Sequence, residues 1–352
     1  MATGPVITPE EIAYQEAHIN DDRTPGIIGG SIVLIVIATT TVVLRLVSRK
    51  IRSDRVRRKT YQIDDYLIII ALILAWAMFI ALMFCCHYGM GKHVLRVGLT
   101  SAFRYARSTY VLEAIYPACT TATKFSILLL YRRVFTTHNF HFRIALYIIS
   151  TVLIGWAIAG FFTTVFQCWP VHVAWDRMGG SCINIAAALI GLAVINTTIN
   201  ASILILPMPM VWALNMPYKQ KIGICLIFLI GCGDVVSSII RTWLTATANL
   251  TSIDVTWFEV DPLTLAFVEP CLGIICACLP VMRPFFQWAF SGVFGMSRFT
   301  GNKFVDESTP AATGVSRLSS NGYARQHSYI RDHGGQDMEM SADIDGDMPE
   351  GR

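Results

Sequence analysis

Residues 66–86 read YLIIIALILAWAMFIALMFCC and contain no charged side chain. At a rise of about 1.5 Å per residue, a helix of this length crosses the hydrocarbon core of a bilayer, which is about 30 Å thick. Mostly apolar segments of similar length are found at residues 26–47, 109–131, 143–166, 185–206, 222–247 and 262–282. The sequence therefore predicts an all-α fold in which seven transmembrane helices form one bundle over residues 26–284.

The composition of the whole chain also indicates a membrane protein. Hydrophobic residues account for 54% of the 352 positions and charged residues for 15%, whereas about a quarter of the residues in a soluble domain are charged. The net charge of +4 is small, so it points neither to nucleic acid nor to an acidic substrate. We expect the lipid bilayer to surround most of the chain, and we predict a multi-pass protein of the plasma membrane.

The distribution of Lys and Arg predicts the orientation of the bundle, because cytoplasmic loops are enriched in these residues. The loop at 48–65 holds seven of them, and the loops at 132–142 and 207–221 hold further ones. The loop at 87–108 holds four and is the one weak signal among the opposite loops. We therefore expect the N-terminal residues 1–25 outside the cell and the C-terminus in the cytoplasm.

The two ends of the chain are polar and differ in kind. Residues 1–25 have neither the basic start nor the apolar run of a signal peptide, so the first helix is expected to direct insertion. Residues 297–352 are rich in Gly, Ser, Asp and Arg and contain few large apolar side chains. Such a segment cannot bury enough surface to fold alone, and we predict a disordered cytoplasmic tail.

Several short motifs follow one another in a fixed order between Arg45 and Pro284. They are Asp64-Asp65-Tyr66, YGMGKH at 88–93, KFSILLLYRRVF at 124–135, Cys168-Trp169-Pro170 with Trp175 and Cys182, LPMP at 206–209 with Trp212, Arg241, and ACLP at 277–280 with Arg283-Pro284. Through these motifs the chain resembles the fungal rhodopsin-domain integral membrane proteins, a family that includes receptor-like proteins and a member of the satratoxin cluster. The resemblance implies a seven-helix membrane protein with a receptor-like role.

The chain departs from that family in two places. Its last predicted span also does not suit the retinal that the family name suggests. Members similar to this chain usually carry an acidic residue at the position of Asn200. The chain also has no cysteine before Cys85, so the Cys-rich extracellular module of some receptor-like relatives is not expected. A retinal Schiff base needs a lysine inside the bundle, and the last predicted span, 262–282, contains none. We expect no retinal and no other cofactor.

Seven polar or ionisable side chains within the predicted spans are the candidate functional residues. They are Glu113, Lys124, Asn196, Asn200, Asp234, Arg241 and Glu269. Such groups are costly in lipid and normally face the bundle interior. Arg241 and Glu269 lie at similar depths, so we predict an ion pair between them; a pair between Lys124 and Asp234 requires the lysine stem to reach outward. Two interpretations remain open, since these charges either fix helix register or line a ligand pocket or switch. For the two asparagines, hydrogen bonding between helices is favoured.

Two cysteines fall in a loop that is predicted to face outside, which is an oxidising setting. We predict a disulfide between Cys168 and Cys182, with Cys85 and Cys86 as competitors at the outer end of the second helix. No zinc or other metal site is expected, because the eight histidines fall outside the predicted spans and show no ligand spacing. Asn249, in the triplet Asn-Leu-Thr, is a possible glycosylation site in another outside loop.

The inner face carries both acidic and basic groups. Asp64 and Asp65 precede the second helix, where carboxylates accept free backbone N–H groups, and capping is favoured there over a partner site. The basic run at 49–59 is an orientation signal that also meets anionic lipid headgroups. A hypothetical docking face for a cytoplasmic signalling protein comprises Arg57, Arg58, Arg132 and Arg133.

Two functions from different classes remain open. The first is a receptor-like sensor that binds an unknown small ligand and signals through its inner loops. The second is a transporter or membrane component associated with a secondary-metabolite pathway, against which the lack of an internal repeat weighs. An enzyme is not expected, because the sequence offers neither a nucleophile with a base nor a metal set.

Overall fold

The computed structural model describes residues 9–56, 62–135, 140–176, 179–209, 218–247 and 254–290. Its long helices are α2 (Thr24–Val56), α3 (Ile63–His87), α5 (Leu99–Phe135), α6 (Phe140–Val165), α8 (Ile185–Ile205), α10 (Tyr218–Thr247) and α12 (Val260–Phe290). Short helices are α1 (Pro9–Ala17), α4 (Val94–Val97), α7 (Val173–Asp176) and α11 (Val255–Phe258), and two short strands are β1 (Cys168–Trp169) and β2 (Ser181–Cys182). The protein is therefore mostly helical, as the sequence predicts.

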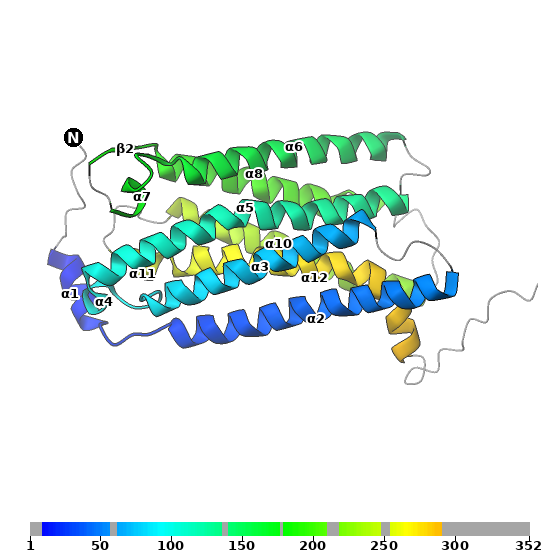
Figure 1. Ribbon diagram of the computed structural model, residues 1–352, viewed down its shortest axis with the longest axis horizontal. Helices are drawn as coiled ribbons and strands as arrows, with labels where there is room; N and C mark the ends of the chain where they lie inside the picture. The colour runs from blue at the N-terminus through cyan, green and yellow to red at the C-terminus, as the bar shows by residue number, and fades with distance from the viewer. Residues whose placement is uncertain are drawn as a thin grey trace, which may run out of the picture. The chain divides into compact units, whose positions relative to one another are not determined.

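The long helices pack lengthwise against one another (Figure 1). In the described part of the chain, six of them are long and apolar enough to cross a membrane, namely α2, α3, α6, α8, α10 and α12. Helix α5 has 37 residues but is less apolar, since it carries Glu113, Lys124 and several threonines. It nevertheless lies among the other helices, where it contacts α3, α6 and α12.

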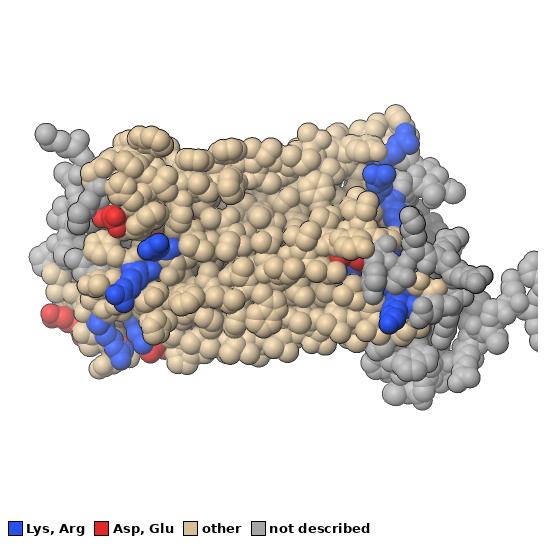
Figure 2. All heavy atoms as spheres, in the orientation of Figure 1, with Lys and Arg blue, Asp and Glu red and all other residues tan. Residues whose placement is uncertain are grey.

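The surface between the two ends of the helices is suited to lipid. Lys, Arg, Asp and Glu of the described residues gather toward the two ends, and the belt between them on the face in Figure 2 is almost free of charged side chains. Large apolar side chains lie outward along this belt, with Val33 58%, Ile73 62% and Phe162 55% exposed. A water-soluble protein rarely exposes so continuous an apolar surface, so these helices fit a multi-pass membrane protein.

Ion pairs close the end of the bundle at which α2 ends and α3 begins. The guanidinium of Arg45, which is fully buried, lies 2.6 Å from Asp64 Oδ2 and 2.9 Å from Asp65 Oδ1, and it donates to the carbonyl of Ala277 on α12 at 2.6 Å. Arg49 pairs with the same carboxylates at 2.5 and 3.3 Å. These contacts join α2, α3 and α12.

This arrangement confirms one expectation from the sequence at Asp65 and corrects another at Arg49. Asp65 does cap α3, because it accepts the N–H of Gln62 at 3.1 Å, but both aspartates are buried and their main partners are arginines. Arg49 belongs to the run that we assigned to orientation and lipid headgroups, yet it is buried. A buried carboxylate pair needs cationic partners, and the preceding helix supplies them one turn apart.

Close approach between helices depends on small residues, as at Gly273 of α12. A Cβ atom at this position would lie 2.8 Å from Cγ2 of Thr123 on α5, a β-branched side chain that has little room to move. We expect Gly273→Ala to lower the free energy of unfolding by about 1–3 kcal/mol, measured as thermal stability in detergent. Gly233→Ala on α10 is the matched control, because nothing lies within 4 Å of its Cβ position. An equal response of the two variants would contradict this packing.

Candidate functional site

A cluster of polar side chains lies inside the bundle around the carboxylate of Glu269 on α12, which is 2% exposed. Its Oε1 accepts hydrogen bonds from the amides of Asn196 at 2.6 Å and Asn200 at 2.9 Å, both on α8. Its Oε2 accepts from the hydroxyl of Tyr116 on α5 at 2.7 Å and from Nη1 of Arg241 on α10 at 3.1 Å. One carboxylate therefore holds four helices together.

The two cations of this cluster are also held by aromatic rings. The Nζ atom of Lys124 lies 3.7 Å from Glu269 Oε1, donates to Oδ1 of Asn196 and lies 5.4 Å from the ring centre of Trp156. The guanidinium of Arg241 lies 4.2 Å above the ring of Tyr116. An aromatic face stabilises a cation more strongly where water is excluded, so these rings help to keep both charges inside the bundle.

The structure brings together five of the seven residues that the sequence selects. The predicted ion pair between Arg241 and Glu269 is present. The alternative pair between Lys124 and Asp234 is not the one formed, because the lysine is paired with Glu269. Tyr116 was missed by the sequence reasoning, although it lies three residues after Glu113 on the same helix and carries a hydroxyl that needs a partner in lipid.

The remaining two candidates line cavities on either side of the cluster. Asp234 borders a cavity of about 30 Å³ together with Thr120 and Lys124, and its buried Oδ1 makes no hydrogen bond within the described residues. Glu113 lines a cavity of about 100 Å³ between α5, α6, α8, α10 and α12. Tyr116 and Arg241 belong both to the wall of this larger cavity and to the Glu269 cluster.

A family model described as the fungal rhodopsin domain matches residues 44–288, which run from α2 to α12. The chain belongs to the fungal rhodopsin domain family. The match includes the Arg45 ion pairs, the Glu269 cluster and both cavities, so these features lie within the family domain. No solved structure matches the chain.

Three curated relatives of this fungal rhodopsin-domain chain show the range of the family. A SAT4 family membrane protein of Emericella nidulans is 29% identical over 267 residues, covering 73% of this chain and 67% of the relative. The polyenoic acids biosynthesis gene cluster protein Ba17b of Metarhizium anisopliae is 28% identical, covering 70% of this chain and 69% of the relative. Receptor GIN3 of Arthrobotrys oligospora is 27% identical, covering 49% of this chain and 42% of the receptor.

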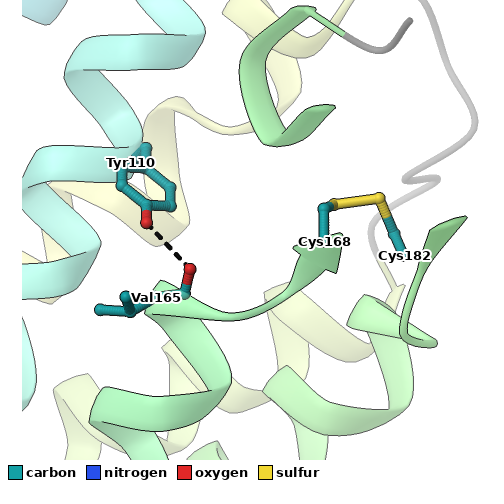
Figure 3. Close-up of a disulfide and its surroundings, with 4 residues drawn as sticks. All are labelled: Tyr110, Val165, Cys168 and Cys182. Atoms are coloured by element: carbon teal, nitrogen blue, oxygen red, sulfur yellow. Dashed lines mark hydrogen bonds between the residues drawn. A yellow bond between two sulfur atoms is a disulfide. The ribbon is translucent and has the colours of Figure 1, made fainter. Parts of the chain in front are cut away.

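A disulfide joins Cys168 of β1 to Cys182 of β2, which pair as directly opposed residues (Figure 3). The competing cysteines Cys85 and Cys86 are free and buried, so the predicted pairing is confirmed. Beside it, the hydroxyl of Tyr110 on α5 donates to the carbonyl of Val165 at the end of α6, at 3.0 Å (Figure 3). The loop between α6 and α8 is thereby fastened at its start and closed on itself.

Removal of this disulfide is expected to weaken the fold measurably. The bridged residues are 14 positions apart, and closing a loop of this length is worth about 3 kcal/mol. Cys168→Ser and Cys182→Ser should therefore lower the thermal midpoint in detergent by the same amount, and the double variant by no more. Dithiothreitol should shift the parent protein to the midpoint of the variants and leave the variants unchanged; a shift in the variants would show that another bond is being reduced.

The YGMGKH motif at 88–93 joins the N-terminal segment to the short helix α11. His93 is buried, with Nδ1 2.5 Å from Asp254 Oδ2 and its ring stacked on Trp257. The guanidinium of Arg23 also lies 4.2 Å from the ring centre of Trp257. Gly91 adopts φ +88°, and a Cβ atom there would lie 3.0 Å from a backbone nitrogen of the segment, so this residue has to be glycine. The motif is structural in this protein.

The same packing supplies partners for two of the four basic residues in the loop at 87–108. Nζ of Lys92 lies 3.5 Å from Asp22, and Arg96 donates to a backbone carbonyl of the N-terminal segment. Slight burial alone would raise the pKa of the Asp22 carboxyl, but hydrogen bonds from Thr24 and the charge of Lys92 lower it below its ordinary value. These basic residues have local partners, so they carry little information about orientation.

Some of the other predicted site residues lie in the described part of the chain, and others lie outside it. Arg132 and Arg133 are exposed at the end of α5, and Arg133 donates to the side chain of Gln62. Arg57, Arg58, Asn249 and the tail at 297–352 lie outside the described residues. Among the described residues, no group of three His, Cys, Asp or Glu side chains is arranged to hold a metal ion.

Proposed function

We propose that this fungal rhodopsin-domain protein is a receptor-like sensor with seven transmembrane helices, located in the plasma membrane. The observation that carries the proposal is the cavity of about 100 Å³ that shares Tyr116 and Arg241 with the Glu269 cluster. A ligand in this cavity would contact side chains that hold α5, α8, α10 and α12 together. A change in their contacts is a means of changing the helix arrangement at the opposite end of the bundle.

The proposed seventh crossing is α5. Its polar side chains Thr120, Thr123 and Lys124 are buried, while Val111 on another side is 45% exposed. A transmembrane helix tolerates ionisable groups when they face the bundle interior and find partners. Its packing among α3, α6 and α12 supports this assignment.

The proposed orientation places the disulfide and the N-terminal segment outside. Disulfides persist in oxidising compartments, and β2 and α1 lie at the same end of the bundle (Figure 1). Arg132 and Arg133, at the end of the long helix α5, would then face the cytoplasm in accord with the positive-inside rule. We propose that they contribute to docking of a cytoplasmic signalling protein, and the name of Receptor GIN3 is consistent with this role. No enzymatic reaction is part of the proposal.

Recruitment of a G-protein α subunit in living fungal cells tests this function. A luciferase fragment fused to the C-terminus should report recruitment when culture extract is added, and Arg132→Glu/Arg133→Glu should abolish the signal at equal surface expression. Arg143→Glu, an exposed arginine at the start of α6, is the matched control and should retain it. Equal signals with and without extract for each α subunit of the host would contradict a receptor role.

The second candidate function is a transporter or membrane component that serves a secondary-metabolite pathway. The names of two relatives favour it, the Ba17b cluster protein and a satratoxin biosynthesis cluster protein of Stachybotrys chartarum that is 24% identical over 223 residues. Deletion of the gene should then change the secreted metabolite profile without altering G-protein recruitment. Uptake or efflux that follows expression in vesicles would distinguish a transporter from other pathway components.

A further inference from the structure

The cavity beside the Glu269 cluster is lined by two carboxylates and one guanidinium. Its charged lining residues are Glu113, Glu259 and Arg241. Arg241 is already engaged, because its Nη1 lies 3.1 Å from Glu269 and its guanidinium covers the ring of Tyr116. These contacts direct the guanidinium toward Glu269 and Tyr116, so the surroundings of the two carboxylates decide where a ligand cation could pair.

The two carboxylates differ in their surroundings. Glu259, in the turn between α11 and α12, accepts a hydrogen bond from the hydroxyl of Tyr105 at 3.2 Å. Glu113, on α5, makes no hydrogen bond or ion pair within the described residues, although it borders the cavity. An unpaired carboxylate away from bulk water is costly, and a cation that pairs with it offsets that cost. Glu113 is therefore the group toward which a ligand cation would be drawn.

The rest of the lining is mostly apolar or aromatic, apart from Thr164 and Thr245, and the space is small. Leu189, Leu192, Leu263 and Ala266 supply an aliphatic wall, and Trp156 supplies a ring. The volume of about 100 Å³ is smaller than the cavity of about 150 Å³ that accepts benzene in an engineered protein. A short aliphatic chain fits such a space, whereas polar groups along that chain would lie against the leucine side chains without hydrogen-bond partners.

We infer that the cavity binds a small alkylammonium ligand, whose ammonium group pairs with Glu113 and whose short apolar chain contacts the leucine wall. This inference rests on the proposed function, because it names the chemical class of the molecule that the sensor binds. A carboxylate opposite an aliphatic wall selects a primary amine over an alcohol of equal length by charge and over a fatty acid by repulsion.

Binding of three probes with equal chain length tests the inference on the purified full-length protein in lipid nanodiscs. The probes are butylammonium, butanol and butyrate at neutral pH, and the readouts are thermal stabilisation and the fluorescence of the protein's tryptophans, of which Trp156 lines the cavity. We expect saturable binding of butylammonium alone. Glu113→Gln should weaken it at least tenfold, whereas Glu16→Gln, an exposed glutamate of α1, should leave it unchanged.

A second variant separates loss of the site from loss of the fold. Ala266→Leu adds bulk to the buried wall of the cavity and keeps every charged residue, so it should abolish butylammonium binding even if Glu113→Gln does not fold. Binding of butanol or butyrate as tight as that of butylammonium would overturn the inference, as would undiminished binding in both variants.

The outcome is independent of the test of the proposed function. Nanodisc binding requires no signalling partner, so butylammonium binding without any G-protein recruitment would support this site and contradict the receptor role. Recruitment in cells by an extract, together with no butylammonium binding by the purified protein, would overturn the ligand class and leave the receptor role standing.

Discussion

Replacement of Glu269 by glutamine is expected to lower the free energy of unfolding by about 3–5 kcal/mol, the range for breaking one partner of a buried ion pair. The carboxylate is paired with Arg241 at 3.1 Å and with Lys124 at 3.7 Å. The substitution leaves both cations buried with fewer partners. It also turns one acceptor atom into an N–H donor that faces other donors. The thermal midpoint of a fluorescent fusion in detergent, followed by size-exclusion chromatography, measures the loss.

A double variant shows whether charge is the cause. Glu269→Gln combined with Lys124→Met removes one of the two stranded cations, so the pair should recover part of the stability that Glu269→Gln alone has lost. Glu16→Gln is the control for a glutamate exposed to solvent. A Glu269→Gln protein as stable as the parent would show that the cluster does not hold these helices together.

Replacement of Arg45 by methionine is the second substitution with a large expected effect, again about 3–5 kcal/mol. Arg45 is fully buried and contacts Asp64, Asp65 and the carbonyl of Ala277 at 2.6–2.9 Å. Methionine fills similar space but leaves two buried carboxylates that share only Arg49. Recovery of folded protein and its thermal midpoint in detergent are the measurements.

The geometry of the guanidinium predicts that lysine cannot replace Arg45. Arg45 uses three nitrogen atoms toward three acceptors, and a lysine ammonium cannot reproduce this fork. Arg45→Lys should therefore retain the charge and still lose more than half of the stability that Arg45→Met loses. Arg143→Met, at an exposed position, is the matched control. Full stability of the lysine variant would mean that charge alone, without the bond to α12, accounts for the role of Arg45.

The helices of the bundle could be predicted because the bilayer imposes a length and an apolar composition on each span. The ends could not, since helices continue beyond the apolar region. Helix α5 begins at Leu99, ten residues before the predicted 109, and α2 continues to Val56 rather than ending at 47. Hydropathy predicts the part of a helix that contacts lipid, but it does not predict how many further turns extend into water.

Most residues of the candidate site could be predicted from the sequence, whereas only one of their ion pairs could. The depth of Arg241 and Glu269 along their helices was sufficient to predict their contact, which is present. The choice of Lys124 between Asp234 and Glu269 depends on how each helix is rotated about its axis, and the spacing of apolar residues fixes this rotation only loosely. Arg49 was not recognised as a partner of the aspartates, because a count of arginines per loop treats buried and exposed ones alike. Arg45 lies inside the first predicted span, 26–47, and was not considered among the ionisable residues of the spans.

Tyr116 belongs to two environments, since its hydroxyl reaches Glu269 while its ring forms part of the cavity wall and lies under Arg241. A single torsional rotation of this phenol would withdraw one of the donors of Glu269 and uncover the face on which the guanidinium rests. Under the proposed function, a ligand that turns Tyr116 in this way would weaken the contacts that join four helices. The change would need to pass through only one side chain.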